Sequence, residues 1–305
     1  MEILGSRQKI MLDEYKRKFD EEGLIVLENL FSDEELDQHL RSVHEIRRRV
    51  DVKDENGFGD RIGQLHQLVP SLMNLAMTNK VLPEILRHAL KDEPLLFGSL
   101  NFEKGSQQRL HVDAIFFWPE PEYSMAGVWV ALEDVDLQNG PLIYVPGSHR
   151  WPMIRSEDIV ADKPDVKSKR DLARAGKISG AELGSFVAEM GNLWTERYYR
   201  WLEEKRIEPT KLVLKKGTAV VWHSLLAHGG DIIADNTRSR NSVVYHFVGR
   251  NSSLFSFESF MLLDRTEFKK GKAEQLVIDR YKGIDYIKYP YFVTYNNGAQ
   301  IVHNI

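Results

Sequence analysis

Apolar and polar residues along the first fifty positions have the spacing of two helices around one short strand. Residues from about 8 to 22 carry apolar side chains at helical intervals, and Gly23 breaks this pattern. The apolar run 24–27 that follows predicts a short buried strand. Ser32 and Glu35 form the S-x-x-E pattern of a capping box, so a second helix is expected to begin just after Ser32.

The chain then changes from helical to strand character. Residues from about 70 to 91 have helical spacing, limited by two prolines, whereas the later segments are short apolar or aromatic runs between turn residues. These runs predict strands at residues 97–102, 110–117, 125–132, 142–145, 212–222 and 242–248. An aromatic-rich tail, residues 286–305, is expected either to add a strand or to pack on the outside.

A charged segment of about residues 150–208 divides the strands and is predicted to be a helical insertion. Its apolar residues recur every four positions, as at Phe186, Met190 and Trp194, which gives one apolar helix face. Helices followed by divided strands predict a fold that is mainly β with flanking α-helices, a sandwich or barrel. Because no repeat or low-complexity linker is present, residues 1–305 are interpreted as a single domain.

Composition and charge exclude several classes of function. The 305 residues contain no cysteine, so any metal must be held by His, Asp or Glu. The net charge is −4, and residues of both signs are interleaved along the chain. The chain therefore lacks the basic stripe that nucleic acids or anionic membranes require. No signal-peptide pattern is present, and no apolar run approaches the roughly 18 residues of a membrane span. We therefore expect a cytoplasmic protein without nucleic-acid or membrane partners.

An H-x-D pattern, His111 and Asp113, lies in one of the predicted strands. Residues i and i+2 of a strand share a face, so the two side chains would form most of a 2-His-1-carboxylate triad for Fe(II). His228 is the expected third ligand, because the two glycines after it suit a site where other groups approach the backbone closely. His223 competes with it, although a core histidine bonded to the backbone is the preferred interpretation there. A hydrogen-bonded His–Asp pair without metal is the alternative for the pattern.

A candidate anion-binding residue follows these histidines. Arg240 stands 12 residues after His228, at the start of a predicted strand whose alternate positions share one face. On an inward face it would be a buried cation in need of an anionic partner. A dicarboxylate co-substrate would match its planar guanidinium. Arg238 has the same parity and is the second candidate, and a structural salt bridge is the alternative for both.

Three segments resemble the phytanoyl-CoA dioxygenase family of Fe(II)/2-oxoglutarate-dependent oxygenases, in the order found there. They are FDEEGLIVLENLFSDEEL, HVDAIFFWPEPEYSMAGVWVALEDVDLQNGPLIYVPGSHR, and KKGTAVVWHSLLAHGG with the later RSRNSVVYHF. The resemblance implies a double-stranded β-helix (jelly-roll) core with N-terminal helices. It also implies Fe(II), 2-oxoglutarate and O2 as cofactor and co-substrates.

The same resemblance implies roles for single residues. Iron would be bound by His111, Asp113 and His228. Arg240 would bind the C5 carboxylate of 2-oxoglutarate, because it precedes His246-Phe247 as the family's arginine precedes its own His-aromatic pair. Further co-substrate contacts are implied for Trp129, Ser242 and Asn101. Gly230 stands where some relatives have a serine, so one co-substrate hydrogen bond is expected to be absent or replaced.

The implied activity is hydroxylation of an aliphatic C–H of a small metabolite or natural-product-like substrate, with release of succinate and CO2. Desaturation or epimerisation would use the same residues. A zinc-dependent hydrolase or lyase on the same ligands and a non-catalytic binding jelly roll are the rival interpretations. Halogenation is not expected, because Asp113 is a carboxylate.

The insertion is expected to form part of the substrate pocket or its lid. His149, Arg150 and Trp151 at its start would either touch substrate or stabilise the turn that precedes them.

Overall fold

The N-terminal part of the computed structural model contains two helices and one strand, as predicted. The structure describes residues 6–50, 61–77, 81–268, 276–296 and 299–305. Helix α1 (Ser6–Glu22) ends at Gly23, whose φ of +78° is open to glycine without strain. Strand β1 (Leu24–Leu27) leads to α2 (Asp33–Val50). The predicted capping box is present, because Ser32 N–H donates to Glu35 Oε2 (2.9 Å) and Glu35 N–H donates to Ser32 Oγ (3.3 Å).

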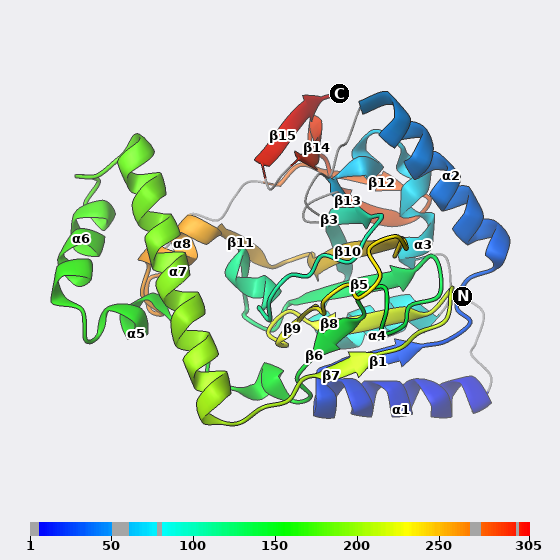
Figure 1. Cartoon of the computed structure of the whole chain (residues 1–305), viewed down its shortest axis with the longest axis horizontal. Helices are drawn as coiled ribbons and strands as arrows, with labels where there is room; N and C mark the ends of the chain where they lie inside the picture. The colour runs from blue at the N-terminus through cyan, green and yellow to red at the C-terminus, as the bar shows by residue number, and fades with distance from the viewer. Residues whose placement is uncertain (1–5, 51–60, 78–80, 269–275, 297–298) are drawn as a thin grey trace.

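A ten-stranded sheet forms the main layer of the described part of the chain (Figure 1). Its main path runs β1-β8-β5-β10-β3-β2-β14-β15, with β13 parallel to β3 and β12 paired with β13. The strands beyond β1 are β2 (Arg61–Gly63), β3 (Pro94–Phe102), β5 (Met125–Ala131), β8 (Ala219–His223), β10 (Ser242–Gly249), β12 (Ile278–Tyr281), β13 (Ile284–Ile287), β14 (Tyr291–Asn296) and β15 (Ala299–Asn304). The aromatic-rich tail therefore adds strands to the sheet, one of the two outcomes expected for it.

A smaller sheet faces the main one. It has the order β7-β6-β9 and consists of β7 (Thr210–Leu212), β6 (Leu142–Tyr144) and β9 (His228–Gly230). A separate pair joins β4 (Phe117–Glu120) to β11 (Ser253–Ser256). The run 212–222, predicted as one strand, is divided between the two sheets because the chain turns at Gly217, which has a φ of +83°. The two facing sheets form the jelly-roll core that was predicted.

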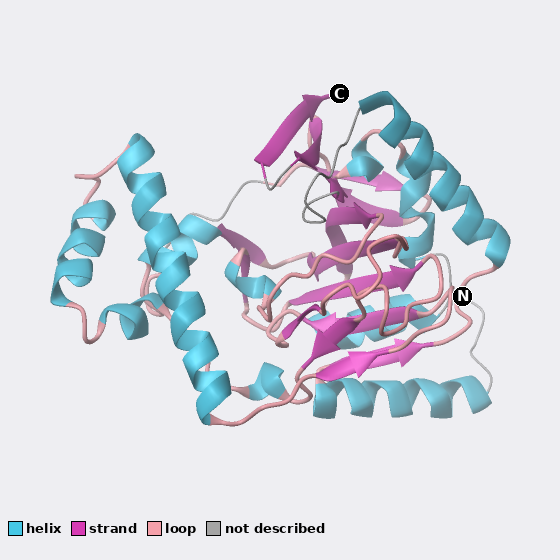
Figure 2. Ribbon diagram, in the orientation of Figure 1, coloured by secondary structure: helices cyan, strands magenta, loops and turns pink. Residues whose placement is uncertain are grey.

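Helices flank this core and fill the insertion (Figure 2). The predicted helical region at 70–91 contains a 3-10 turn and two short helices. The remaining helical elements are η1 (Leu65–Gln67), η2 (Pro70–Met73), α3 (Asn74–Met77), α4 (Val81–Leu90), η3 (Asp113–Ile115), η4 (Ser148–Arg150), α5 (Ser156–Val160), α6 (Pro164–Arg174), α7 (Gly180–Glu204) and α8 (Phe257–Leu262). The insertion is thus helical, as expected, and α6 and α7 project from one end of the sheets (Figure 1). None of the described helices is long and apolar enough to cross a membrane.

Strand alternation gives each face of the main sheet its own neighbours. In β5, Val128 and Val130 belong to a core cluster with α1 and α4 residues, represented by Phe19 and Leu86. Trp129, between them, packs instead with residues of the small sheet. One face of the sheet is therefore covered by helices, and the other is directed toward the space between the two sheets.

The strand predicted at residues 110–117 is wrong. His111 forms an isolated bridge with His228, Asp113 begins the 3-10 helix η3, and the ladder begins only at Phe117. The neighbouring side chains of Val112, Ala114 and Ile115 are buried against the helical insertion and do not alternate between two faces. The apolar character of the run thus reflects packing on several sides, which periodicity cannot distinguish from a buried strand.

Candidate metal centre and cavity

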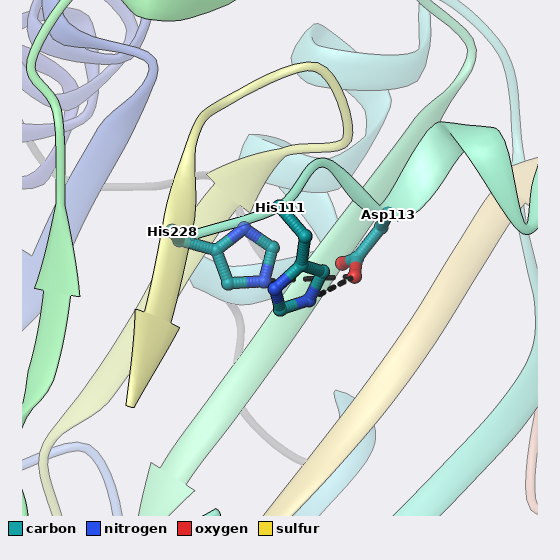
Figure 3. Close-up of side chains that lie close together, drawn as sticks. All are labelled: His111, Asp113 and His228. Carbon is teal, nitrogen blue, oxygen red and sulfur yellow. Dashed lines mark ion pairs between the residues drawn. The ribbon is translucent and has the colours of Figure 1, made fainter. Parts of the chain in front are cut away.

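Three side chains from two distant segments meet at the end of the small sheet. The backbones of His111 and His228 exchange hydrogen bonds of 2.9 and 3.0 Å, which sets their rings side by side. The turn of η3 then directs Asp113 toward both rings, and its Oδ1 lies 3.5 Å from each Nε2 (Figure 3). One ligand atom from each residue lies within 4.8 Å of the others. This cluster has the composition and spacing to hold a metal ion.

Backbone carbonyl groups orient both imidazoles. The Nδ1 of His111 lies 2.9 Å from the Arg109 carbonyl oxygen, and the Nδ1 of His228 lies 3.0 Å from that of Leu226. Each Nδ1 must carry the proton to donate to a carbonyl, which leaves the Nε2 lone pair directed at the cluster. Burial lowers the pKa of His228 to about 4, so its ring is neutral at neutral pH. Both rings are therefore prepared to bind a cation through Nε2.

The second carboxylate oxygen of Asp113 has partners of its own. Trp222 Nε1 donates a 2.8 Å hydrogen bond to Oδ2, and His246 Nε2 lies 3.5 Å from the same atom. Burial alone would raise the pKa of Asp113, but the facing rings of His228, His111 and His246 lower it well below its usual value. The carboxylate is therefore ionised. Its Oδ1 faces the two histidines, and its Oδ2 accepts the hydrogen bond from Trp222. Sequence reasoning did not identify Trp222 as part of the site.

Two glycines give the cluster the room it needs. A Cβ on Gly229 would lie 2.6 Å from the Gln108 carbonyl oxygen, so only glycine lets β9 lie so close to the segment that leads to His111. A Cβ on Gly127 would lie 2.4 Å from the Trp222 ring, which is its cross-strand neighbour. The close backbone approach predicted after His228 is thus present.

The cluster opens into a cavity of about 520 Å³ between the sheets. Its wall combines the three clustered residues with Arg240 and Trp129, and most of the remaining lining is apolar. Pockets of this size that are mainly apolar with a few convergent polar groups are typical of small-molecule sites. The cavity is therefore the place where a reacting molecule would meet a bound metal.

The buried guanidinium of Arg240 lines this cavity with an unsatisfied donor. Arg240 is 2% exposed; its Nη1 donates to the Gly140 carbonyl (3.1 Å), while its Nε has no partner. Trp129 Nε1 and Ser242 Oγ are also buried without a partner, and the guanidinium carbon lies 5.5 Å from the Trp129 ring. Burial lowers the pKa of Arg240 to about 10, so the group stays charged. This arrangement suits a carboxylate ligand, because such a ligand accepts several hydrogen bonds at once.

Arg238, the second candidate for the anion site, lies at the surface. Its Nη2 forms a 3.0 Å ion pair with Asp136, which is the structural alternative considered for it. Of these two candidates, Arg240 is therefore the one that lines the cavity.

Asn101 lies on the opposite face of β3 from the cavity. Its Oδ1 is 2.8 Å from His39 Nε2, whereas its neighbours Leu100 and Phe102 line the cavity. Strand alternation explains this placement, and it removes Asn101 from the co-substrate contacts that were expected.

His223 and Gly230 were also considered in the sequence, and the structure shows what each of them contacts. The ring of His223 is buried and accepts a 3.1 Å hydrogen bond from the Leu225 N–H, so it is a core histidine bonded to the backbone, as expected. A turn separates His223 from β9, so the two histidines do not lie on one strand. At Gly230, the Ser106 hydroxyl lies 2.7 Å from where a Cβ would stand, and Ser106 lines the cavity.

The insertion supports the cavity from outside. None of its described residues lines the cavity, so the structure does not place it in the pocket itself, and its expected role as a lid stays a prediction. Instead, Gly191 of α7 packs closely on Phe257, which lines the cavity and stacks on Phe116 with ring centroids 5.6 Å apart. The turn residues at its start, His149 and Arg150, bond to the Asp20 carbonyl at 3.2 and 3.3 Å. Of their two expected roles, the structure favours stabilisation of the turn.

Comparison with known proteins places the chain among relatives of the same architecture. The model of the phytanoyl-CoA dioxygenase (PhyH) family matches residues 19–233. A phytanoyl-CoA dioxygenase domain-containing protein 1 homolog from Caenorhabditis elegans is 20% identical over 296 residues, covering 81% of this chain and 94% of that protein. The peroxisomal phytanoyl-CoA dioxygenase of Bos taurus is 27% identical over 283 residues, covering 83% and 73%.

A solved structure shows the same fold. The crystal structure of the epimerase SnoN in complex with Fe3+, alpha ketoglutarate and nogalamycin RO has a TM-score of 0.60 at 15% identity, covering 82% of this chain and 88% of that one. The family match includes all three clustered residues, five of the ten strands of the main sheet and the three strands of the small sheet. The chain belongs to the phytanoyl-CoA dioxygenase family.

Proposed function

We propose that this protein is an Fe(II)- and 2-oxoglutarate-dependent dioxygenase that hydroxylates an aliphatic C–H of a small molecule. The reaction would consume O2 and 2-oxoglutarate and release succinate, CO2 and the hydroxylated product. The observation that carries the proposal is the presence, in one cavity, of the His111–Asp113–His228 cluster and the buried Arg240 guanidinium. A metal site alone would leave that cation and its unsatisfied neighbours without a purpose.

The residues present fit both groups. His111 and His228 through Nε2 and Asp113 through Oδ1 would hold Fe(II) on one side, which leaves its other coordination positions for ligands from the cavity. When bound, iron with 2-oxoglutarate supplies the redox chemistry that dioxygen requires. Arg240 would pair with the distal carboxylate of 2-oxoglutarate, with Trp129 Nε1 and Ser242 Oγ as further donors. The similar fold of SnoN, crystallised with Fe3+ and alpha ketoglutarate, supports this pairing.

The rest of the cavity would position the substrate and limit water. Leu100, Phe102 and Val244 give the cavity wall an apolar surface. Such a surface strengthens the electrostatic contacts inside the cavity because it excludes water. The proposal treats residues 1–305 as one oxygenase domain with a small-molecule substrate in the cytoplasm. The peroxisomal relative from cattle makes localisation by organelle fractionation a necessary check.

Alternative reactions at the same site can be distinguished by the mass of the product. The similar fold of an epimerase shows that this architecture also serves epimerisation in another protein, and desaturation would use the same groups. A zinc-dependent hydrolase would use the three ligands but leaves Arg240 unexplained. Mass analysis separates these outcomes, since hydroxylation adds one oxygen, desaturation removes two hydrogens and epimerisation leaves the mass unchanged.

The test is succinate formation by protein purified without oxygen. The protein is given Fe(II), 2-oxoglutarate and ascorbate, oxygen is admitted, and succinate is measured by mass spectrometry. We expect iron-dependent succinate that is lost in His228→Ala and kept in His44→Ala, a matched control because His44 is exposed on α2. Absence of succinate together with tight zinc binding would overturn the proposal in favour of the hydrolase.

A further inference from the structure

A second arginine of the cavity has no role in the proposed metal and co-substrate sites. Arg61 on β2 lines the cavity, and its guanidinium carbon lies 4.5 Å from the centre of the Tyr295 ring on β14. Its Nε is buried without a hydrogen-bond partner among the described residues. Burial lowers its pKa from the usual arginine value.

The strand register separates Arg61 from Arg240. Arg61 pairs with Phe102 on β3, and Phe102 pairs in turn with Ser242 on β10. Two strand spacings, about 10 Å, therefore lie between the backbones of β2 and β10. Arg240 lies on the far side, with its guanidinium carbon 6.0 Å from the Phe102 ring. Because the strand that carries Phe102 lies between β2 and β10, we expect a carboxylate that pairs with Arg240 to leave Arg61 free for a second anion.

Aromatic side chains line the cavity on the side of the metal cluster. Phe116 stacks on Phe257, and the ring of Phe116 lies 6.1 Å from that of His111. Phe117 is 47% exposed although it also lines the cavity, and exposed aromatic side chains that cluster at a cavity are typical of ligand-binding surfaces. The cavity thus offers an apolar surface beside the metal cluster and a separate cation farther along the main sheet.

We propose that the primary substrate carries an anionic oxygen group, a carboxylate or a phosphate, that binds Arg61. Its apolar or aromatic part lies against Phe116, Phe117 and Phe257, next to the metal cluster. The guanidinium offers a planar set of N–H donors that matches either anion. The Tyr295 ring supports the guanidinium from one side, so less freedom is lost when the anion binds. This proposal rests on the proposed function, since it names the substrate class of that site.

A purely structural contact is the competing explanation. Stacking of Arg61 on Tyr295 joins β2 to β14, and these strands also pair through Val293 and Thr294. Such a contact needs the ring and the cation but no anion. The two explanations therefore differ in whether a charged small molecule binds more tightly than its uncharged counterpart.

The experiment is isothermal titration calorimetry with three probes that share one phenylbutyl skeleton. They are 4-phenylbutyrate, 4-phenylbutyl phosphate and the uncharged 4-phenylbutanamide. Each is titrated without oxygen into protein loaded with Fe(II) and 2-oxoglutarate, and again into metal-free protein. We expect at least one charged probe to bind about tenfold more tightly than the amide or better, because charge-assisted hydrogen bonds are worth that much. Which charged probe binds more tightly identifies the anion.

Variants assign this difference to Arg61. Arg61→Gln should remove the preference for charged probes, Arg61→Lys should keep part of it, and Arg238→Gln should leave it unchanged. The affinity for 2-oxoglutarate should not change in Arg61→Gln. Equal binding of all three probes to the unaltered protein would overturn the proposal, even if Arg61→Gln failed to fold. A loss of 2-oxoglutarate affinity in Arg61→Gln would overturn it as well, because Arg61 would then serve the co-substrate.

The metal-free titration keeps the two proposals apart. Because no described contact joins Arg61 to the metal cluster, preference for charged probes should persist without iron. Protein that prefers charged probes yet forms no succinate would refute the oxygenase proposal alone. Protein that forms iron-dependent succinate yet shows no preference would refute the anionic substrate alone.

Discussion

Trp222 Nε1 donates a 2.8 Å hydrogen bond to Asp113 Oδ2, on the side of the carboxylate that faces away from His111 and His228. Trp222 lies near the end of β8, and Gly127 on β5 is its cross-strand partner. The indole thus fixes the rotation of the carboxylate and leaves Oδ1 for a metal. Loss of a residue that hydrogen-bonds to a metal ligand typically lowers metal affinity by roughly 10- to 100-fold.

Trp222→Phe is expected to weaken metal binding without unfolding the protein. Phenylalanine keeps an aromatic ring beside the Asp113 carboxylate but cannot donate the hydrogen bond. We expect Fe(II) or Co(II) affinity, measured by anaerobic titration, to fall by roughly 10- to 100-fold. Trp201→Phe on α7 serves as the control, since Trp201 contacts Trp151 and lies outside the cavity lining. Equal affinity in Trp222→Phe and the unaltered protein would show that Asp113 is oriented by other groups.

Gly127→Ala should disturb the same site by a steric route. The new methyl group would stand 2.4 Å from the Trp222 ring, so the indole must shift and its bond to Asp113 must lengthen. We expect a loss of about 1–3 kcal/mol in the free energy of unfolding, measured with urea, together with weaker metal binding. Gly184→Ala in α7 has open space and should leave metal affinity unchanged while slightly stabilising the helix. Unchanged metal affinity in Gly127→Ala would mean that the indole does not orient the carboxylate.

Arg240→Gln and Arg238→Gln should separate the two arginine candidates. Loss of the buried Arg240 cation is expected to weaken 2-oxoglutarate binding by roughly 10- to 100-fold, the value of a charged hydrogen bond. Arg238→Gln should have little effect, because that side chain pairs with Asp136 at the surface. Calorimetric titration of 2-oxoglutarate into Fe(II)-loaded protein measures both. The reverse order of effects would assign the co-substrate to Arg238.

The buried His39 should make the fold sensitive to acid. Burial lowers its pKa to about 4, below the ordinary value of 6.5, so the unfolded chain binds a proton more readily than the folded one. This stability is present above pH 6.5 and is lost as pH falls toward 4. Between pH 7 and pH 5 the loss is about 2 kcal/mol from this residue.

The measurement is urea unfolding of metal-free protein at the two pH values. His39→Gln keeps a donor for Asn101 Oδ1 but cannot titrate, so its stability should fall by about 2 kcal/mol less than that of the unaltered protein. His66 and His223, whose pKa values burial lowers to about 3, should still give the variant some acid sensitivity. Parallel pH curves for the two proteins would rule out His39 as a source.

Helix ends and strands that depend on a few neighbouring residues could be predicted from the sequence. The capping box at Ser32, the break at Gly23 and the alternating run 242–248 all depend on neighbours in sequence, and each is present. The strand assumed for His111 and Asp113 is absent, yet the two side chains do meet, because the bridge to His228 and the turn of η3 bring them together. A short apolar run does not distinguish these conformations.

The site contacts that could not be predicted join residues that are far apart in the sequence. The bond from Trp222 to Asp113 joins residues 109 positions apart, and Arg61 meets Tyr295 only because β2 is placed between β3 and β14. Neither contact has a local pattern, since β2 has only three residues. Asn101 shows the converse, because its alternation with Leu100 along β3 is a local signal that directs it away from the cavity.

The contact between Gly191 and Phe257 also bears on how such enzymes diversify. α7 contacts the cavity wall at the back of Phe257, and residues of the same insertion pack on Val112, Ala114 and Ile115 beside the metal ligands. A substitution at Gly191 can therefore reshape the aromatic wall, whereas a change in the residues that pack on Val112 or Ala114 also reaches the reactive centre. Different positions of one insertion are thus free to vary to different degrees as long as the reaction is kept.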